Sequence, residues 1–288
     1  MATAASLISN VRLYYGDPSG EFITDSVGME WLSLAQERFV NNVMPLDEVK
    51  DYILTAKQKR YDLPDNCIEP TRVIWYKDMQ TILTAESPPE FERLQSGFPN
   101  GIGRPVFYTV FRRQLVVGPQ SPVANSATSL ASGAHNTSTT VIGVATGSGV
   151  FRARGWAIVA STGEVFEYTG VSGDTLTGCT RGLHNTTAAS VPSNATITQV
   201  DMQMQYRRTP SAVATTSESP VIPTAFHRYL EMYMLYRAWL SRGDSSKAQI
   251  AYNEFESFEE TAKEKVGRRF LEPISIKDRS RRGRSGYW

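Results

Sequence analysis

The middle of this chain differs in chemistry from the sequence on either side of it. Between about Ser121 and Val200 the chain is rich in Gly, Ser, Thr and Ala and holds only six charged residues. No lysine occurs between Lys77 and Lys247, whereas both flanks are charged, aromatic and patterned for helices. This pattern predicts one domain, built from both flanks, that is interrupted by an inserted β module.

The overall composition restricts the class of protein. Of the 288 residues, 41% are hydrophobic and 20% are charged, which is ordinary for a folded chain. The formal net charge is +1, so no global field draws the protein onto nucleic acid or an anionic membrane. No apolar run approaches the ~18 residues of a membrane span, and we expect no membrane partner.

Two helices are predicted at the start of the first flank. One begins at Asp25 or Ser26 and ends near Met44, with apolar residues three and four positions apart. The second covers residues 46–60, where the same spacing places Leu46, Val49, Ile53 and Ala56 on one stripe. Its lysines are interleaved with acidic residues, which favours a solvated face over a nucleic-acid patch. The short connection predicts an antiparallel pair.

Strand signals follow in the first flank. Residues 72–76 and 81–83 are rich in β-branched and aromatic residues. The segment from Ser87 to Glu90 is a capping box with prolines in the first turn, and it predicts a short helix. Residues 104–118 predict a β-hairpin.

The insert is predicted to be all β. Short strand signals recur at residues 140–145, 155–160, 164–170, 175–179 and 195–200, and Gly173-Asp174 is a good hairpin turn. Even spacing and glycine turns are typical of a small sandwich or barrel. Its Ser/Thr-rich surface is suited to hydrogen bonding with sugars or neighbouring subunits, and it is equally consistent with an inert β surface. Glu164 and Glu167 fall on opposite faces of a strand, which argues against a glycosidase carboxylate pair.

The second flank returns to helices after a strand over residues 202–208. A helix begins near Thr224 and ends at Gly243, and another begins at Asp244 or Ser245. The last thirteen residues, 276–288, carry five basic residues and one acidic residue and end in Gly-Tyr-Trp. Three interpretations stay open for this tail: an arm that docks on a partner, a contact with DNA phosphates, or a disordered tail.

The sequence offers no catalytic signature. It has no phosphate loop, no G-x-G-x-x-G, no G-x-S-x-G and no H-E-x-x-H motif. Its three histidines are far apart and its two cysteines are isolated, so no metal site or cofactor is predicted. We therefore expect a structural protein and not an enzyme.

The order of motifs in the flanks resembles a known family. The series is a helical hairpin, Glu90-Phe-Glu-Arg-Leu, Arg104-Pro-Val-Phe-Tyr-Thr-Val-Phe, Met204-Gln-Tyr-Arg-Arg-Thr-Pro and Ile222-Pro-Thr-Ala-Phe-His-Arg-Tyr-Leu. It resembles the head-to-tail adaptor, or connector, proteins of tailed bacteriophages, including the gp4-like tail accessory proteins. In the insert, residues 167–182 resemble a β module of phage tail and baseplate proteins.

The resemblance implies an α+β fold: a helical-bundle adaptor domain with a small antiparallel sheet, interrupted by an all-β, sandwich- or barrel-like insert. The expected domains are residues 1–118 with 201–271, residues 119–200, and a C-terminal arm of residues 272–288. It also implies a virion protein of the neck, assembled in the host cytoplasm, that forms a homo-oligomeric ring, commonly of twelve copies. The ring encloses double-stranded DNA without sequence-specific binding. Its implied partners are the portal protein and tail, nozzle or tail-terminator proteins, with tail fibres as a further candidate.

Two sets of site residues follow from this resemblance. Residues expected to dock on the portal are Arg268, Arg269, Phe270, Arg279, Arg281, Arg282, Arg284, Tyr287 and Trp288. An alternative is a tail or baseplate component whose insert binds host glycan or tail fibres. Trp156, Phe166 and Tyr168 would then lie on an exposed face of the insert.

Overall fold

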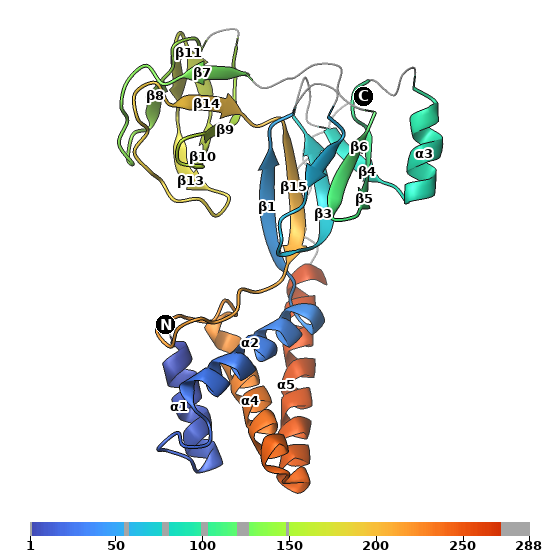
Figure 1. Ribbon diagram of the computed structural model, residues 1–288, viewed down its shortest axis with the longest axis vertical. Coiled ribbons are helices and arrows are strands. Elements are labelled where there is room, and N and C mark those ends of the chain that lie inside the picture. Colours follow the sequence, from blue (N-terminus) through green and yellow to red (C-terminus); the bar gives the residue numbers. More distant parts are fainter. Residues whose placement is uncertain are drawn as a thin grey trace, which may run out of the picture. The chain divides into compact units, whose positions relative to one another are not determined.

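A computed structural model describes residues 2–54, 58–76, 81–98, 103–119, 127–147 and 150–271, except the side chains of residues 267–271. The chain divides into two compact units (Figure 1). The helical unit comprises Met1–Leu46 and Thr209–Trp288, and the β unit comprises Asp47–Arg208. The domain boundaries expected from the sequence stay a prediction.

The helical unit is built from α1 (Ala4–Tyr15), α2 (Asp25–Asn42), a 3-10 turn η2 (Thr224–Phe226), α4 (His227–Arg242) and α5 (Ser245–Leu271). These helices enclose one apolar core, in which Phe39, Tyr229 and Phe255 are almost fully buried. Gly243 ends α4 in the left-handed conformation, with φ of 80°, as the sequence predicts. This tight turn lets α5 fold back along α4 (Figure 1).

The largest element of the β unit is a seven-stranded sheet with the order β1-β15-β3-β4-β5-β6-β2. Its strands are β1 (Leu46–Tyr52), β2 (Arg60–Asp62), β3 (Cys67–Trp75), β4 (Thr81–Ala85), β5 (Phe107–Phe111), β6 (Gln114–Gly118) and β15 (Met202–Arg208). Every strand contributes to one core beneath the sheet. The rings of Tyr52 on β1 and Tyr61 on β2 lie 5.6 Å apart, and the Tyr52 hydroxyl donates to the carbonyl of Asp62 at 3.0 Å. The sheet therefore curls until its two terminal strands meet.

Helix α3 (Pro88–Ser96) covers part of the outer face of this curled sheet. Phe91 of α3 packs on Phe107 and Val116, which alternate with the inward-facing residues of β5 and β6. Ser87 precedes the helix, but its side chain makes no capping hydrogen bond, so the predicted capping box is not formed.

The inserted module contains two small antiparallel sheets around a common core. One has the order β13-β10-β9-β14-β7 and the other β11-β12-β8. The strands are β7 (Thr128–Leu130), β8 (Val141–Gly143), β9 (Gly155–Val159), β10 (Val165–Tyr168), β11 (Gly170–Ser172), β12 (Thr175–Thr177), β13 (Thr180–Leu183) and β14 (Thr196–Gln199). The predicted turn at Gly173-Asp174 joins β11 to β12.

The fold class predicted from the sequence is wrong. We expected a helical-bundle domain with a small sheet, but the described residues hold sheets of seven, five and three strands beside five α-helices. The fold is therefore mostly β. The main error lies in residues 46–60, where the described residues form β1 and the first residue of β2 and no helix. Pairing of β1 with β15, about 150 residues later in the chain, overrides the local helical spacing.

Candidate interaction surfaces

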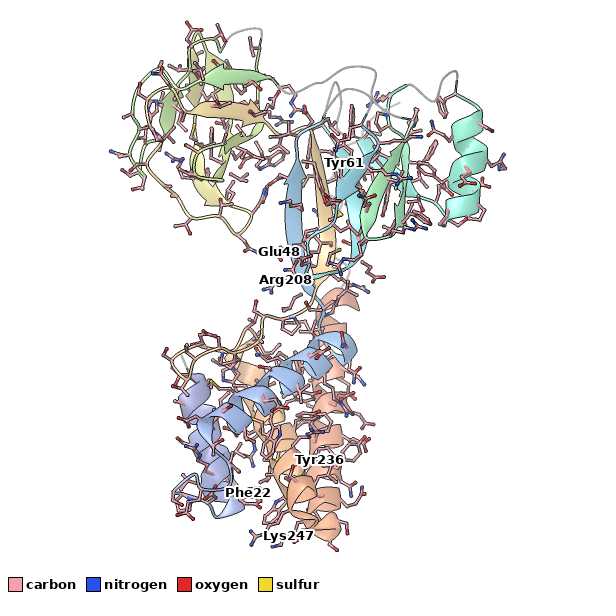
Figure 2. All side chains as sticks on the ribbon, in the orientation of Figure 1. Phe22, Glu48, Tyr61, Arg208, Tyr236 and Lys247 are labelled. Carbon is pink, nitrogen blue, oxygen red and sulfur yellow. The ribbon has the colours of Figure 1, made fainter. Side chains whose placement is uncertain are left out.

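Aromatic and basic side chains gather at one end of the helical unit. The ring of Tyr15 stacks on Phe22 at 5.2 Å and lies 4.5 Å from Trp239. The Lys247 ammonium lies 4.2 Å from the centre of the Trp239 ring (Lys247 and Phe22 are labelled in Figure 2). Within this row Phe22 is 42% exposed, whereas Tyr15 is buried and Trp239 is half-buried. One exposed ring is ordinary on a protein surface, so the row is a small candidate contact for a partner and not an extended apolar patch.

A buried carboxylate joins α5 to α2 and α4. Glu259 accepts hydrogen bonds from Tyr229 at 3.2 Å, from Asn42 at 3.2 Å and from Lys263 at 2.7 Å. The Arg38 guanidinium lies 3.5 Å from the same carboxylate. Burial acts to raise the pKa of Glu259, but the hydrogen bonds and nearby cations outweigh it and lower the pKa below its ordinary value. The network fixes the helix that leads into the C-terminal segment.

The residues expected to dock on the portal lie at the end of that helix and beyond it. Arg268, Arg269 and Phe270 belong to the last turns of α5, and their side chains lie outside the described residues. Residues 272–288 also lie outside them, including Arg279, Arg281, Arg282, Arg284, Tyr287 and Trp288. Their role stays a prediction.

In the β unit, two residues after β13 hold the module against the curled sheet. His184 and Asn185 both have left-handed backbone conformations, with φ of 52° and 62°. The His184 Nδ1 lies 2.5 Å from the Asp51 carboxylate of β1. The Asn185 side chain donates to Glu48, which lies three residues before Asp51 on the same strand. We call these four residues the module clamp.

The module clamp is supported by further buried polar groups. Gln203 donates to Asp51 at 3.0 Å and accepts from the Tyr76 hydroxyl at 3.0 Å. Burial raises the pKa of Tyr76 to about 12, so its hydroxyl stays protonated and able to donate. Arg208 lies 3.4 Å from Glu48 (Figure 2). Hydrogen bonds, the first of them from Asn185, lower the pKa of Glu48 against the effect of its burial.

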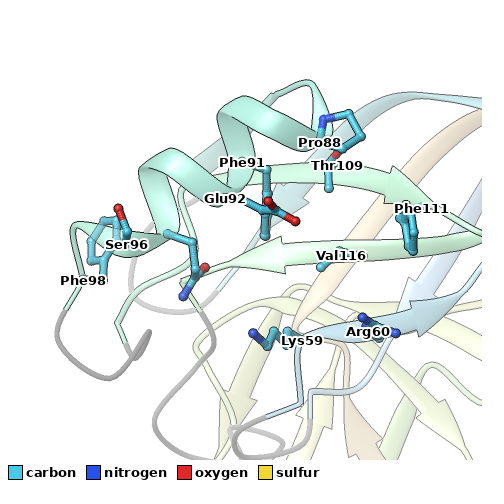
Figure 3. Close-up of a pocket in the computed structure, with 11 residues that line it drawn as sticks. Lys59, Arg60, Pro88, Phe91, Glu92, Ser96, Phe98, Thr109, Phe111 and Val116 are labelled. Carbon is cyan, nitrogen blue, oxygen red and sulfur yellow. The ribbon is translucent and has the colours of Figure 1, made fainter.

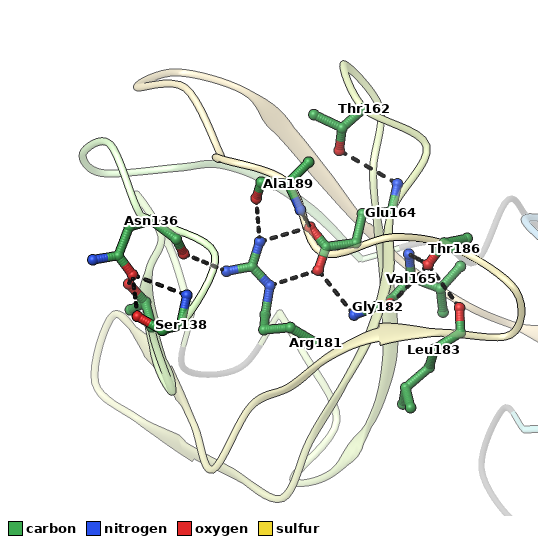
Figure 4. A network of polar contacts seen from close by, with 11 residues as sticks. Asn136, Ser138, Thr162, Glu164, Val165, Arg181, Gly182, Leu183, Thr186 and Ala189 are labelled. Carbon is green, nitrogen blue, oxygen red and sulfur yellow. Dashed lines mark hydrogen bonds and ion pairs between the residues drawn. The ribbon is translucent and has the colours of Figure 1, made fainter.

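The interior of the module is organised by one buried ion pair (Figure 4). Arg181 donates to both carboxylate oxygens of Glu164, at 2.7 and 2.6 Å. The same carboxylate accepts from the backbone N–H groups of Gly182 and Ala189, each at 3.1 Å. Burial acts to raise the pKa of Glu164, but these donors lower it. The Glu164 carboxylate therefore has a structural role, because both of its oxygens already accept hydrogen bonds within the module.

The aromatic residues expected on the face of the insert are mostly interior. Phe166 and Tyr168 are fully buried in the core of the module. Trp156 is half-buried and lies 4.9 Å from Tyr76 of the curled sheet, beside the module clamp. They do not form a shared exposed face for a sugar ring. Alternation of β10 places Phe166 and Tyr168 on the same side of the strand, and the core lies on that side.

Two other kinds of site are absent from the described residues. Among the described residues, no three His, Cys, Asp or Glu side chains gather as metal ligands. In the same part of the chain, no helix is both long and apolar enough to cross a membrane.

Comparison with known protein families identifies the family of this chain. The model of the family described as SU10 adaptor protein matches residues 2–282, nearly the whole sequence. The chain belongs to the SU10 adaptor protein family. It is a phage adaptor, which is a structural component of the virion that interacts with components of the portal and tail. No curated protein sequence matches it.

The family confirms part of what the sequence predicted. The resemblance to phage adaptors is confirmed, while the gp4-like assignment and the tail-type nature of the insert stay predictions. Sequence reasoning missed the module clamp and the network around Glu259. Neither has a local signal, because the clamp joins Asp51 to His184 and the network joins Asn42 to Glu259.

Proposed function

We propose that this adaptor forms the ring that joins the portal vertex to the tail and extends the DNA channel. The observation that carries the proposal is the family match over residues 2–282, which spans both units and most of the C-terminal segment. Copies of the chain form the ring, commonly twelve of them, and a tail, nozzle or tail-terminator protein binds its far side. Double-stranded DNA passes through the ring without sequence-specific contacts.

In this proposal the C-terminal segment attaches the ring to the portal. The segment from Arg268 to Trp288 is basic and ends in two aromatic residues, which suits pockets rimmed by carboxylates. The buried network at Glu259 holds α5 in the helical unit, so the segment starts from a fixed helix. The exposed ring of Phe22, which stacks on the buried Tyr15, supplies a further apolar contact for a partner.

Electron microscopy of a mixture with the portal protein from the same genome tests the proposal. We expect a new ring layer on the portal with the full chain, and none after truncation behind Glu272. The truncated chain should keep the circular dichroism of the full chain, because the apolar cores of the described residues all lie before that residue. Arg154→Ala, an exposed change in the insert, is the matched control and should still form the layer. A layer of normal occupancy with the truncated chain contradicts the docking role.

A further inference from the structure

Helix α3 covers only part of the outer face of the curled sheet. Phe91 of this helix packs against Phe107 in an edge-to-face contact, with ring centres 5.1 Å apart. Next to the helix lies a groove of about 610 Å³ (Figure 3). Its floor includes Thr109, Phe111 and Val116 of β5 and β6, and Phe111 is 43% exposed. Grooves of ~300–1,000 Å³ with apolar floors are typical of binding sites. We call this groove the α3 groove.

The two walls of the α3 groove differ in charge. Lys59 and Arg60 line the side at β2, opposite Glu92 on the side of α3 (Figure 3). Both basic residues are exposed, and within the described part of the chain neither side chain has an ion pair. The α3 groove is therefore lined by two exposed cations on its β2 wall and by the partly exposed ring of Phe111 in its floor.

Helix α3 shows what this sheet face accepts. Its Phe91 is buried to 6% exposure against the sheet, and Glu90 and Glu92 flank it in the sequence. Glu90 is held by Arg93 of the same helix at 2.8 Å, away from the sheet. An aromatic anchor between carboxylates thus already packs on part of this face. The neighbouring groove also has apolar residues in its floor, and it has cations at its rim.

We propose that the α3 groove binds a short acidic segment of another protein, with an aromatic or aliphatic anchor resting on Phe111 and Val116. The anchor removes the exposed apolar floor from water. Carboxylates of the segment lie along the β2 wall, where Lys59 and Arg60 complement their charge. This binding site does not depend on a ring or on the portal, so it goes beyond the function proposed above.

A synthetic peptide with the sequence of residues 86–98 of this chain is the probe, because it carries the Glu-Phe-Glu pattern. Labelled with fluorescein, it should bind the full protein saturably at concentrations up to about 1 mM, measured by fluorescence anisotropy. Binding should weaken in high salt, because the wall contacts are exposed ion pairs. A peptide with Phe91→Ala should bind at least about tenfold more weakly.

Two groove variants and one control decide the outcome. Lys59→Glu combined with Arg60→Glu should weaken peptide binding at least about tenfold, and so should Phe111→Ser on its own. Arg154→Glu reverses an exposed charge on the insert and should leave binding unchanged. The absence of saturation, or equal affinity in the wild type and both groove variants, overturns the proposal. Self-association of the wild type in sedimentation velocity that both variants abolish also overturns it, because the groove then holds a second copy.

Discussion

At the scale of single residues, we expect substitution of Arg181 to cause a large loss of stability. Its guanidinium is 5% exposed, and it satisfies Glu164 together with the carbonyls of Asn136 and Ala189, at 3.0 and 2.6 Å. Arg181→Met leaves a buried carboxylate without its cation, which costs about 3–5 kcal/mol. Urea denaturation of the variant and the wild type measures this loss.

A matched change on the surface separates burial from charge. Arg207 pairs with Glu69 at 2.6 Å, but both side chains are about half exposed. Arg207→Met should therefore cost less than about 1 kcal/mol, since water screens exposed pairs. If both variants lose similar stability, the Glu164–Arg181 pair does not organise the core of the module.

At the scale of elements, the attachment of α5 depends on the ionisation of Glu259. Its folded pKa is lower than its ordinary value, so its contribution is complete above about pH 4.5 and is lost as the pH falls through the folded pKa. Glu259→Gln removes this dependence. The midpoint of thermal unfolding of the wild type should fall more steeply between about pH 5 and pH 3 than that of the variant. Parallel pH profiles would contradict the assignment.

Elements with a strong local pattern were predictable, and those defined by distant pairing were not. The helix from Asp25, the turn at Gly243 and the hairpin over residues 104–118 match the structure, because caps and turn residues act locally. The helix predicted over residues 46–60 was wrong, because Glu48 and Asp51 resemble charged residues on the solvent-exposed face of a helix. They are in fact satisfied by Asn185 and His184, which lie more than 130 residues away.

The candidate surfaces also differ in how far the sequence could predict them. The basic, aromatic C-terminal segment was visible in composition alone, whereas the α3 groove was not. Its floor and its wall come from separate strands, Phe111 on β5 and Arg60 on β2, which only the order of the curled sheet brings together. A sequence pattern shows which face of a strand a residue occupies, but it does not show which strands are neighbours.

At the scale of the whole molecule, the chain contains two units that share no apolar core: one core lies in the helical unit, and the cores of the curled sheet, of the module and beneath α3 lie in the β unit. The helical core is closed by residues from both ends of the chain, because α1 and α2 pack with α4 and α5. The β unit is continuous from Asp47 to Arg208. Within it the module contacts the curled sheet through the module clamp, through the rings of Trp156 and Tyr76, and through the short join at Val200-Asp201, where both residues are buried.

Because the two units share no apolar core, we predict that the full chain does not unfold in a single two-state step. Calorimetry should show two transitions, and substitutions in one unit should move only one of them. His184→Ala removes a partner of the buried Asp51 carboxylate and should lower the transition of the β unit, with a loss of about 1–3 kcal/mol. Glu259→Gln should lower the other transition. Combining the two changes should give the sum of their separate effects, whereas a single transition moved by both would show that the units unfold as one cooperative body.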